Sequence, residues 1–391
     1  MNLNIDFDIY DLEYNVSSNE TSNYSYYVET VINELNQNKN DYSFYSRFIL
    51  SCISFAIIII GLITNFISSL AFSNKNNLSS TNIYLTSLCL VDCIALIGLL
   101  INSVIYGIFV QLKYLNGLKL IMFFYPYVYP IVLTSQFANI YLTMSVSINQ
   151  YITIAFSKGF KMTQNKVLKK KDIKQAFIIV LALLIFSVIF CLPYWFKFSY
   201  NEIDGLQRTQ ISESKFFNKI VHLFLYIPFA YVIPFIFLIT TNTYLLIKLT
   251  KVNNSKENIK SRALITYTTS TNPASARTEI NLLSNNSPLT RMKTKKDFEM
   301  KNKSTMLVAI VFFFLICQFP TLILHLIETE SFGQNYKEHL FYFHLVELSK
   351  LLLIINLSFN FAFFYLFSKK FKSNLRNVLC LNRSHSDIIV I

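Results

Sequence analysis

Long apolar segments alternate with polar segments along the chain. A transmembrane helix needs roughly 20 apolar residues, and seven segments are close to or above this length. These segments are longer than β-strands. A buried helix of a soluble protein also does not require an uncharged stretch such as CISFAIIIIGLI. The pattern therefore predicts an all-α membrane protein, a seven-transmembrane helix bundle over residues 46–367. The segments lie at residues 46–72, 82–110, 121–156, 175–195, 221–249, 304–328 and 340–367.

Basic residues mark the loops that we expect in the cytoplasm. Seven lysines lie from Lys158 to Lys174, after the third segment, and 12 basic residues lie from Lys248 to Lys303, after the fifth. Lys and Arg are retained on the cytoplasmic side of a membrane. This rule places the N-terminus outside the cell and predicts a multi-pass protein of the plasma membrane. Residues 250–303 are rich in Asn, Ser, Thr and Lys, which predicts a disordered cytoplasmic loop.

Residues 1–45 are expected to form an extracellular tail. Residues 1–42 contain eight acidic residues and one lysine. They lack the basic and apolar regions of a cleavable signal peptide, so we expect the first crossing helix to act as the signal. Three N-x-S/T triplets in this tail predict glycosylation, although Asn is abundant throughout the chain. The triplets begin at Asn15, Asn19 and Asn23.

Composition limits the chemistry of the chain. Of its 391 residues, 53% are hydrophobic and 15% are charged, whereas a soluble domain carries roughly 25% charged residues. The formal net charge of +13 suggests a nucleic acid as a first idea. The positions of the basic residues in the predicted cytoplasmic loops argue against it, and no nucleic-acid partner is expected. The six cysteines have neither the spacing of a disulfide framework nor that of a zinc site. Neither a metal site nor a cofactor is predicted.

Several polar residues fall inside the predicted membrane segments. Asp92 lies midway along the second segment, and charges persist inside a bilayer mainly where they line a cavity or do work. Asparagines on other segments lie at a similar depth. With Asp92 they predict a polar centre that holds a hydrated cation or relays a helix movement; the alternative is hydrogen bonding that only holds the bundle together. These asparagines are Asn65, Asn139, Asn356 and Asn360.

A second group of polar residues lies near the outer ends of the last three segments. Glu347 and Lys350 are one helical turn apart and can pair on one face. With aromatic and titratable residues of the fifth and sixth segments, they predict the rim of a ligand pocket that opens to the outside. The alternative is that each is an interfacial side chain reaching toward the membrane surface. The other rim residues are His222, Tyr226, His325, Glu328, Tyr342 and His344.

Short motifs follow one another in a fixed order along the segments. They are GLITN, STNIYLTSLCLVD, YPYVYP with TSQFANIYLT, IPFIFLITTN, FLICQFP, and NLSFNF with YLFSKKFK. Their order resembles that of the rhodopsin-like (class A) G-protein-coupled receptors, and among these the invertebrate FMRFamide-type neuropeptide receptors. A series of motifs in the correct order is far more specific than any one of them.

The resemblance implies a receptor whose extracellular peptide ligand shifts a helix-bundle equilibrium. The shift opens a cytoplasmic cleft for a heterotrimeric G protein. In this family Asp92 would be the carboxylate of a sodium site, with Asn139, Asn356 and Asn360 beside it.

The resemblance also implies mobile and lipid-contacting parts. Pro234 and Pro320 would be helix kinks, because proline removes one backbone donor. Residues 368–391 would contain a short amphipathic eighth helix that contacts membrane lipid and begins at Lys369. Cys380 would be a palmitoylation candidate near the end of this helix.

The chain departs from the family at the end of the third segment and in the seventh. Asn149, Gln150 and Tyr151 occupy the G-protein coupling position, where the family has Asp/Glu-Arg-Tyr. Gln150 cannot supply the charge or the five donors of an arginine. Phe364 replaces a tyrosine of the seventh segment, and Tyr365 faces about 100° away around the helix.

The family's disulfide between the third helix and the second extracellular loop is also absent. Tyr125 stands at the helix position, and residues 196–220 contain no cysteine. Without this bond the loop is less constrained, so a defined hairpin is not expected there.

Three functions fit these features. The chain is a signalling neuropeptide receptor, a receptor-derived protein that binds ligand without ordinary coupling, or a chemosensory receptor or transporter. A transporter more often shows inverted repeats or broken helix pairs. A membrane hydrolase needs clustered His, Asp or Glu ligands, so we do not expect an enzyme.

In the favoured hypothesis, an amidated peptide with a basic or aromatic end enters between the third, fifth, sixth and seventh helices. Glu347 or Glu328 meets a basic group of the peptide. Gln136 and Phe319 contact the ligand on its side toward the membrane centre. The helices then rearrange, with the sixth helix bending at Pro320.

Overall fold

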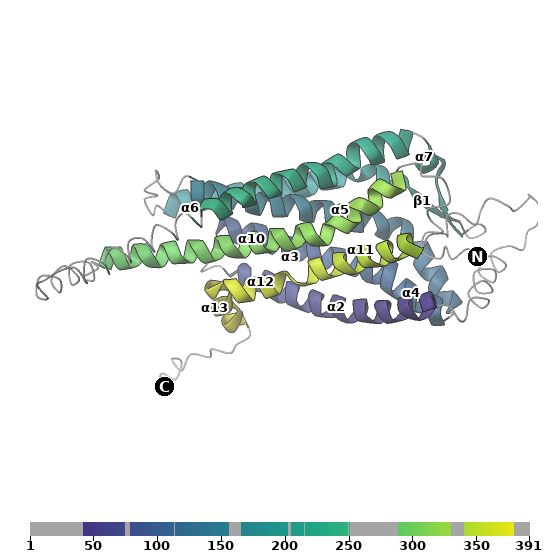
Figure 1. Ribbon diagram of the computed structural model, residues 1–391, viewed down its shortest axis with the longest axis horizontal. Coiled ribbons are helices and arrows are strands. Elements are labelled where there is room, and N and C mark those ends of the chain that lie inside the picture. The colour runs from purple at the N-terminus through teal and green to yellow at the C-terminus, as the bar shows by residue number, and fades with distance from the viewer. Residues whose placement is uncertain are drawn as a thin grey trace, which may run out of the picture.

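The computed structural model of the chain is almost entirely helical (Figure 1). It describes residues 42–74, 79–112, 114–155, 166–201, 205–214, 216–248, 250, 288–329 and 340–378. Within these ranges, seven helices are long and apolar enough to cross a membrane, which confirms the predicted bundle. The crossings are Phe48–Phe72, Ser80–Val110, Asn116–Thr153, Lys170–Phe196, Lys219–Lys248, Thr305–Ile327 and His344–Phe367.

Three crossings are single helices, and the other four change helix type or break along their length. The single helices are α2 (Tyr42–Phe72), α5 (Leu115–Ala155) and α10 (Pro288–Thr329). The second crossing consists of α3 (Ser80–Leu99), the π-helical η4 (Leu100–Ile105) and α4 (Tyr106–Leu112). The fourth consists of α6 (Lys166–Phe190) and the 3-10 helix η5 (Leu192–Phe196). The fifth begins with the π-helical η6 (Phe217–Tyr226) and η7 (Pro228–Val232), and the seventh consists of α11 (Leu340–Ser358) and α12 (Asn360–Phe367).

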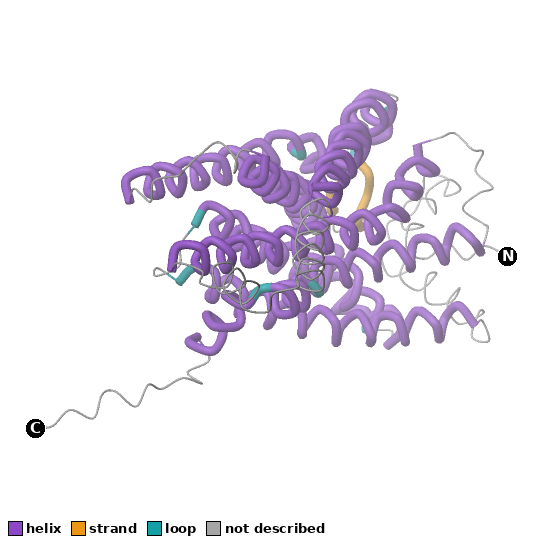
Figure 2. The backbone as a smooth tube through the Cα atoms, turned by 60° about the vertical axis from the view of Figure 1, so that its left-hand side comes forward, coloured by secondary structure: helices purple, strands orange, loops and turns teal. Residues whose placement is uncertain are grey.

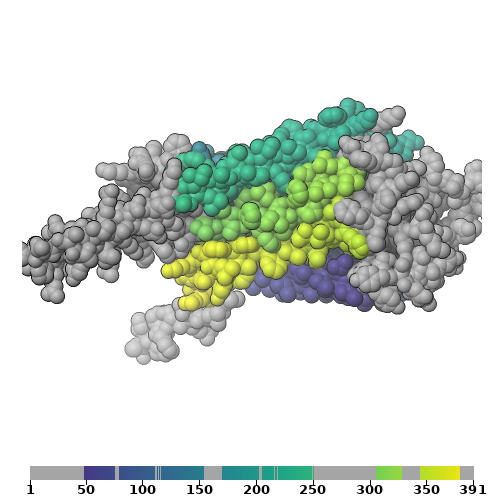
Figure 3. Space-filling view, viewed as in Figure 1, coloured from purple at the N-terminus to yellow at the C-terminus, as the bar shows by residue number. Residues whose placement is uncertain are grey.

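The bundle is apolar on its outside as well as in its core. Figure 2 shows the helices running side by side, and Figure 3 shows one face of the bundle, with the fifth, sixth and seventh crossings in teal, green and yellow above the purple first crossing. Large apolar side chains such as Ile60, Ile189 and Phe312 are more than half exposed on this outer surface. Such exposure fits a hydrocarbon solvent, in which the backbone groups of each helix are satisfied internally.

Two short elements mark the opposite ends of the bundle (Figure 1). One end carries a hairpin of the strands β1 (Phe198–Asn201) and β2 (Gly205–Arg208), and we call it the hairpin end. The other end carries the short helix α13 (Lys369–Val378), and we call it the α13 end. This helix buries Phe371 and Leu375 and exposes Lys369. The Asn374 side chain donates a hydrogen bond of 3.0 Å to a backbone carbonyl of α2. The predicted amphipathic eighth helix is therefore present and docks against the first crossing.

The hairpin corrects the expectation of an unconstrained loop. β1 and β2 pair antiparallel, with Phe198 opposite Arg208, and Gly205 adopts a positive φ of 74° near the turn. The Phe198 ring packs edge-to-face on Tyr125 and Tyr129, with centroids 5.3 and 5.0 Å away. Aromatic pairs of this kind stabilise beyond the area that they bury. The tyrosine at the expected cysteine position thus helps to hold the loop by packing instead of by a covalent bond.

The loop predicted over residues 250–303 is shorter than expected. α10 begins at Pro288, so residues 288–303 are helical, and the prediction was wrong for this part. The backbone N–H at the first helical position has no partner within the helix, so proline, which lacks this N–H, is favoured there. α10 remains helical through Pro320, as α5 does through Pro126 and Pro130.

Candidate functional site

A cavity of about 210 Å³ lies at the hairpin end of the bundle. It is bounded by the second, third, sixth and seventh crossings, by the hairpin and by η6. Four residues predicted for the ligand pocket line it: Gln136 of α5, His222 of η6, His325 of α10 and Lys350 of α11. The structure thus brings together side chains that are far apart in the sequence.

Two π-helical segments supply polar groups to the cavity. η4 contributes Asn102 and Ser103, and η6 contributes His222. π-helical turns are rare and frequently occur at functional sites. Neither Asn102 nor Ser103 was predicted from the sequence, because hydrophobic periodicity does not distinguish a π-helical turn from an α-helical one.

Tyr226, a predicted ligand-binding residue, does not line the cavity. Its side chain is 2% exposed in the core cluster behind the cavity wall. There it stacks on His222 at 5.6 Å and meets His325 edge-to-face at 5.7 Å. The Tyr194 hydroxyl hydrogen-bonds His222 Nδ1 at 2.8 Å. Tyr226 therefore supports two imidazoles that do line the cavity.

Phe319, which was predicted to sense the ligand, does not line the cavity either. It is 54% exposed on the outer surface of α10, whereas the neighbouring Gln318 is 3% exposed. Consecutive helical residues point about 100° apart, so a shift of one residue changes the face. The inward side chain that lines the cavity is Thr321, one turn before His325. This i, i+4 relation to a predicted rim residue was the signal that could have found it.

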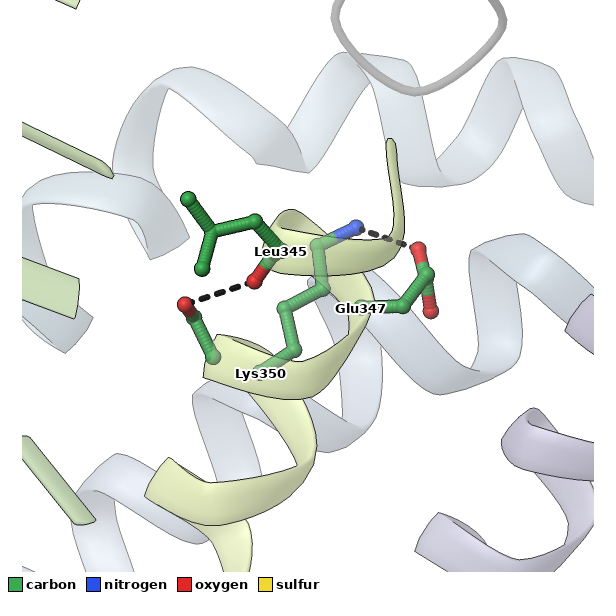
Figure 4. A network of polar contacts seen from close by, with 4 residues as sticks. Leu345, Glu347 and Lys350 are labelled. Carbon is green, nitrogen blue, oxygen red and sulfur yellow. Dashed lines mark hydrogen bonds and ion pairs between the residues drawn. The ribbon is translucent and has the colours of Figure 1, made fainter. Parts of the chain in front are cut away.

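Glu347 and Lys350 form the predicted pair. Lys350 Nζ lies 3.3 Å from Glu347 Oε1, and Figure 4 shows the two side chains meeting along one face of α11. Of the two, Lys350 lines the cavity, and Glu347 is not among the lining residues. The carboxylate expected to meet a basic ligand group is thus bound to an internal lysine.

Two further cations line the cavity, and the sequence analysis missed both. Lys197 precedes β1, and Arg208 ends β2. Lys197 Nζ donates to the Tyr129 hydroxyl at 3.1 Å and lies 5.1 Å from the centroid of that ring and 5.2 Å from that of Phe198. Cation–π attraction stabilises a positive charge in such surroundings. Only the hairpin brings these residues to the site, and a hairpin was not expected.

Asn102 Oδ1 and Thr321 Oγ1 are buried polar atoms of the cavity wall without a hydrogen-bond partner within the described ranges. Asn102 Oδ1 is an acceptor, and Thr321 Oγ1 can donate and accept. Buried polar groups are nearly always hydrogen-bonded, so each exception calls for an explanation. A ligand that supplies a donor and an acceptor would satisfy both.

A second polar site lies deeper in the bundle, around Asp92. This side chain is fully buried. Asn139 Nδ2 of α5 donates to one carboxylate oxygen, and Asn360 Nδ2 of α12 donates to the other at 2.7 Å. The predicted polar centre therefore joins the second, third and seventh crossings through one carboxylate.

The other two asparagines of the prediction have different surroundings. Asn65 Nδ2 donates to the Leu357 carbonyl at 2.8 Å and links the first crossing to the seventh. Asn356 is buried, but it forms no hydrogen bond with Asp92 in the part of the chain that the structure describes.

The three residues of the predicted coupling position lie at the α13 end. Asn149 Nδ2 donates to Thr81 Oγ1 of α3 at 2.9 Å. Gln150 is buried. The Tyr151 ring lies 4.9 Å from that of Tyr244 of the fifth crossing. This stretch therefore contacts two neighbouring crossings.

Phe364 and Tyr365 face in different directions, as predicted. Phe364 is fully buried and packs on Phe72 at 4.9 Å and Phe371 at 5.7 Å. Tyr365 is exposed, with Lys372 Nζ 4.8 Å from its ring centroid. The apolar ring thus joins the first crossing to α13.

Several predicted positions lie outside the described residues. These are the glycosylation candidates Asn15, Asn19 and Asn23, the palmitoylation candidate Cys380 and the side chain of Glu328.

Comparison with known proteins agrees with this architecture. A family model described as "7 transmembrane receptor (rhodopsin family)" matches residues 64–360. The FMRFamide receptor of Drosophila melanogaster is 23% identical over 325 residues, which are 80% of this chain. The chain spans about half the length of this relative, since the match covers 50% of it.

Proposed function

Because the chain belongs to the rhodopsin family of seven-transmembrane receptors, we propose that it is a peptide receptor that signals through heterotrimeric G proteins. Its place as a multi-pass membrane protein follows from the family and from the seven crossings. The peptide ligand is supported by its similarity to the Drosophila receptor, whose name refers to FMRFamide. The observation that carries the proposal is the cavity at the hairpin end, which has polar and aromatic walls inside an apolar bundle.

The hairpin end faces the outside of the cell in this proposal. Lysines are concentrated between the third and fourth crossings, at the α13 end. Because basic residues are retained in the cytoplasm, the α13 end is cytoplasmic and the hairpin end is extracellular. The N-terminal tail with Asn15, Asn19 and Asn23 then lies outside, where these residues are glycosylated. A peptide reaches the cavity from the same side.

Binding is transmitted along α10. Thr321 and His325 line the cavity directly after Pro320, which deprives the helix of one backbone hydrogen bond. A ligand that favours one position of these residues shifts the equilibrium between two arrangements of α10. The G protein docks at the α13 end, close to Gln150.

A second candidate function is that of a receptor without ordinary coupling. Gln150 favours it, since a buried glutamine cannot replace the fixed charge of the family's arginine at this position. The same experiment separates the two functions.

The test is a signalling screen in cells that express the chain or its Gln150→Arg variant, against a panel of amidated neuropeptides. A response of the unchanged chain supports the coupled receptor. A response of Gln150→Arg alone supports the uncoupled receptor. Silence of both, with surface expression verified by antibody, contradicts the assignment to this peptide class.

A further inference from the structure

We propose that the amide of Asn139 takes the place of a cation beside Asp92, so that the polar centre binds no sodium ion. The resemblance to the receptor family implies a sodium site at this carboxylate. The groups that surround Asp92 in this chain do not fit such an ion. The proposal concerns the bundle itself and needs no ligand, so it goes beyond the proposed function.

Both oxygens of the Asp92 carboxylate accept amide hydrogens from the chain. Asn139 Nδ2 donates to Oδ1, and Asn360 Nδ2 donates to Oδ2 at 2.7 Å. The carboxylate is fully buried, so these donors replace the water that an exposed carboxylate would bind. Hydrogen bonds to an ionised group are about twice as strong as those between neutral groups. The bundle thus supplies its own partners for Asp92.

A sodium ion would need oxygen ligands at the same place. Sodium has nearly the radius of calcium, which takes roughly six to eight oxygens at about 2.3–2.6 Å. The amides of Asn139 and Asn360 turn their nitrogens toward Asp92 instead of their oxygens. An amide NH2 group is a donor only and cannot bind a cation. A cation beside Asp92 would therefore meet the positive ends of two amide dipoles.

The opposite orientation of the amides requires a cation. If the amides of Asn139 and Asn360 were turned round, each would place an oxygen against an oxygen of Asp92. Negative partial charges at this distance repel each other unless a cation lies between them. Hydrogen-bonded amides and a bound cation are thus alternatives that exclude each other, and the hydrogen bonds to Asp92 are those of the first.

Asn139 is the residue that decides between the two alternatives. It is buried on α5, with Ser135 one turn before it and Thr143 one turn after it, and both of these are buried as well. Ser135 Oγ donates to the Ile131 carbonyl at 2.8 Å and keeps its lone pairs. Oxygens of this kind suit a hard cation. This face of α5 therefore has oxygens on both sides of an amide that points its N–H at Asp92.

The amide has a physical consequence that an ion would not have. A sodium ion can dissociate, and its occupancy follows the salt outside the cell. A side-chain donor is covalently attached to its helix and is always present. The link between α3 and α5 through Asp92 and Asn139 should therefore be independent of the cation in solution.

The experiment compares the thermal unfolding of the purified full chain in sodium, potassium and choline chloride. Circular dichroism in detergent micelles follows the loss of helix. Each salt is used at about 0.15 M, which keeps the screening of charges equal. No peptide is added, so the outcome does not depend on the proposed function.

The test variant is Asn139→Ser, which removes the amide donor and adds a hydroxyl oxygen beside Asp92. Asn139→Thr does the same with a smaller loss of volume, and it serves if the first variant does not fold. Asn65→Ser is the matched control, because the Asn65 amide is also buried but donates to the Leu357 carbonyl at 2.8 Å. Lys219→Gln, at an exposed lysine of η6, is the surface control.

We expect the unchanged chain to unfold at the same temperature in all three salts. Asn139→Ser should unfold at a lower temperature in potassium and choline chloride, because one oxygen of a buried carboxylate loses its donor. Sodium should raise this temperature by about 2–5 °C at roughly ten times its Kd, since it binds the folded state alone. Asn65→Ser and Lys219→Gln should not distinguish sodium from potassium.

Three results would overturn the proposal. The first is a higher unfolding temperature of the unchanged chain in sodium than in potassium, because the amides would then give way to a cation. The second is a lack of preference for sodium in both Asn139→Ser and Asn139→Thr, because the amide would then not be what excludes the ion. The third is an equal preference for sodium in Asn65→Ser, which would assign the effect to the loss of any buried amide.

Discussion

The cavity at the hairpin end and the polar centre around Asp92 both place polar groups inside an apolar bundle, but they complete their hydrogen bonds differently. At the centre, each oxygen of one carboxylate accepts an amide N–H from a different crossing. In the cavity wall, Asn102 Oδ1 and Thr321 Oγ1 have no partner within the described ranges. A satisfied network rigidifies a structure, whereas incomplete hydrogen bonding suits a site that receives a ligand. The difference separates the part that holds the helices from the part that we propose binds the ligand.

Removal of the central carboxylate should have the largest effect on stability. Asp92→Ala leaves the amides of Asn139 and Asn360 buried without their acceptor, and the cost should be about 3–5 kcal/mol. Thermal unfolding of the purified protein measures it, with Lys219→Gln as the control. A variant as stable as the unchanged chain would show that Asp92 does not hold the crossings together.

Loss of the aromatic contact under the hairpin should come next. Phe198→Ala removes a buried ring that packs on Tyr125 and Tyr129, at a cost of about 3 kcal/mol. Because the hairpin carries Lys197 and Arg208, peptide affinity should fall as well. Hydrogen exchange of residues 198–208 should become faster, while the exposed Phe196→Ala leaves it unchanged. Equal exchange in both variants would mean that other contacts order the loop.

Neighbouring positions of α10 should differ in effect. Gln318→Ala empties a buried position and should cost roughly 1–3 kcal/mol. Phe319→Ala alters a side chain on the outer surface and should leave both stability and ligand response near those of the unchanged chain. Unfolding temperature and signalling potency are compared side by side. A larger loss for Phe319→Ala would restore its predicted role in ligand sensing.

The smallest effect on stability is expected in the cavity itself. Lys350→Gln breaks a partly exposed ion pair, and such pairs contribute at most about 1 kcal/mol. Stability should therefore hardly change. The comparison between cavity and centre fails if Lys350→Gln destabilises the protein as much as Asp92→Ala does.

Much of the fold could be predicted because the bilayer imposes simple rules. Uncharged segments of sufficient length must form helices, and a carboxylate inside one of them must find partners. These rules gave the seven crossings and the grouping of Asp92 with Asn139 and Asn360. The amphipathic helix after Ser368 was implied by the resemblance of NLSFNF and YLFSKKFK to the receptor family.

The details of the cavity were harder to predict for physical reasons. A membrane helix such as α10 carries apolar residues around its whole circumference, so no stripe reveals which side faces inward. This ambiguity explains why Phe319 was named from the sequence and Thr321, which lines the cavity, was not. Lys197 and Arg208 reach the cavity only through strand pairing, and without the expected disulfide nothing in the sequence indicated that the strands would pair.

The packing of Tyr125 on Phe198 has a consequence for the redox chemistry of the receptor. Where a covalent bond ties the loop to the third helix, oxidation must precede a finished binding site, and a reductant can undo it. Here the described cysteines Cys52, Cys89, Cys93, Cys191 and Cys317 are all free. The hairpin over the cavity is held by ring contacts, so we expect thiol reductants to leave the cavity intact.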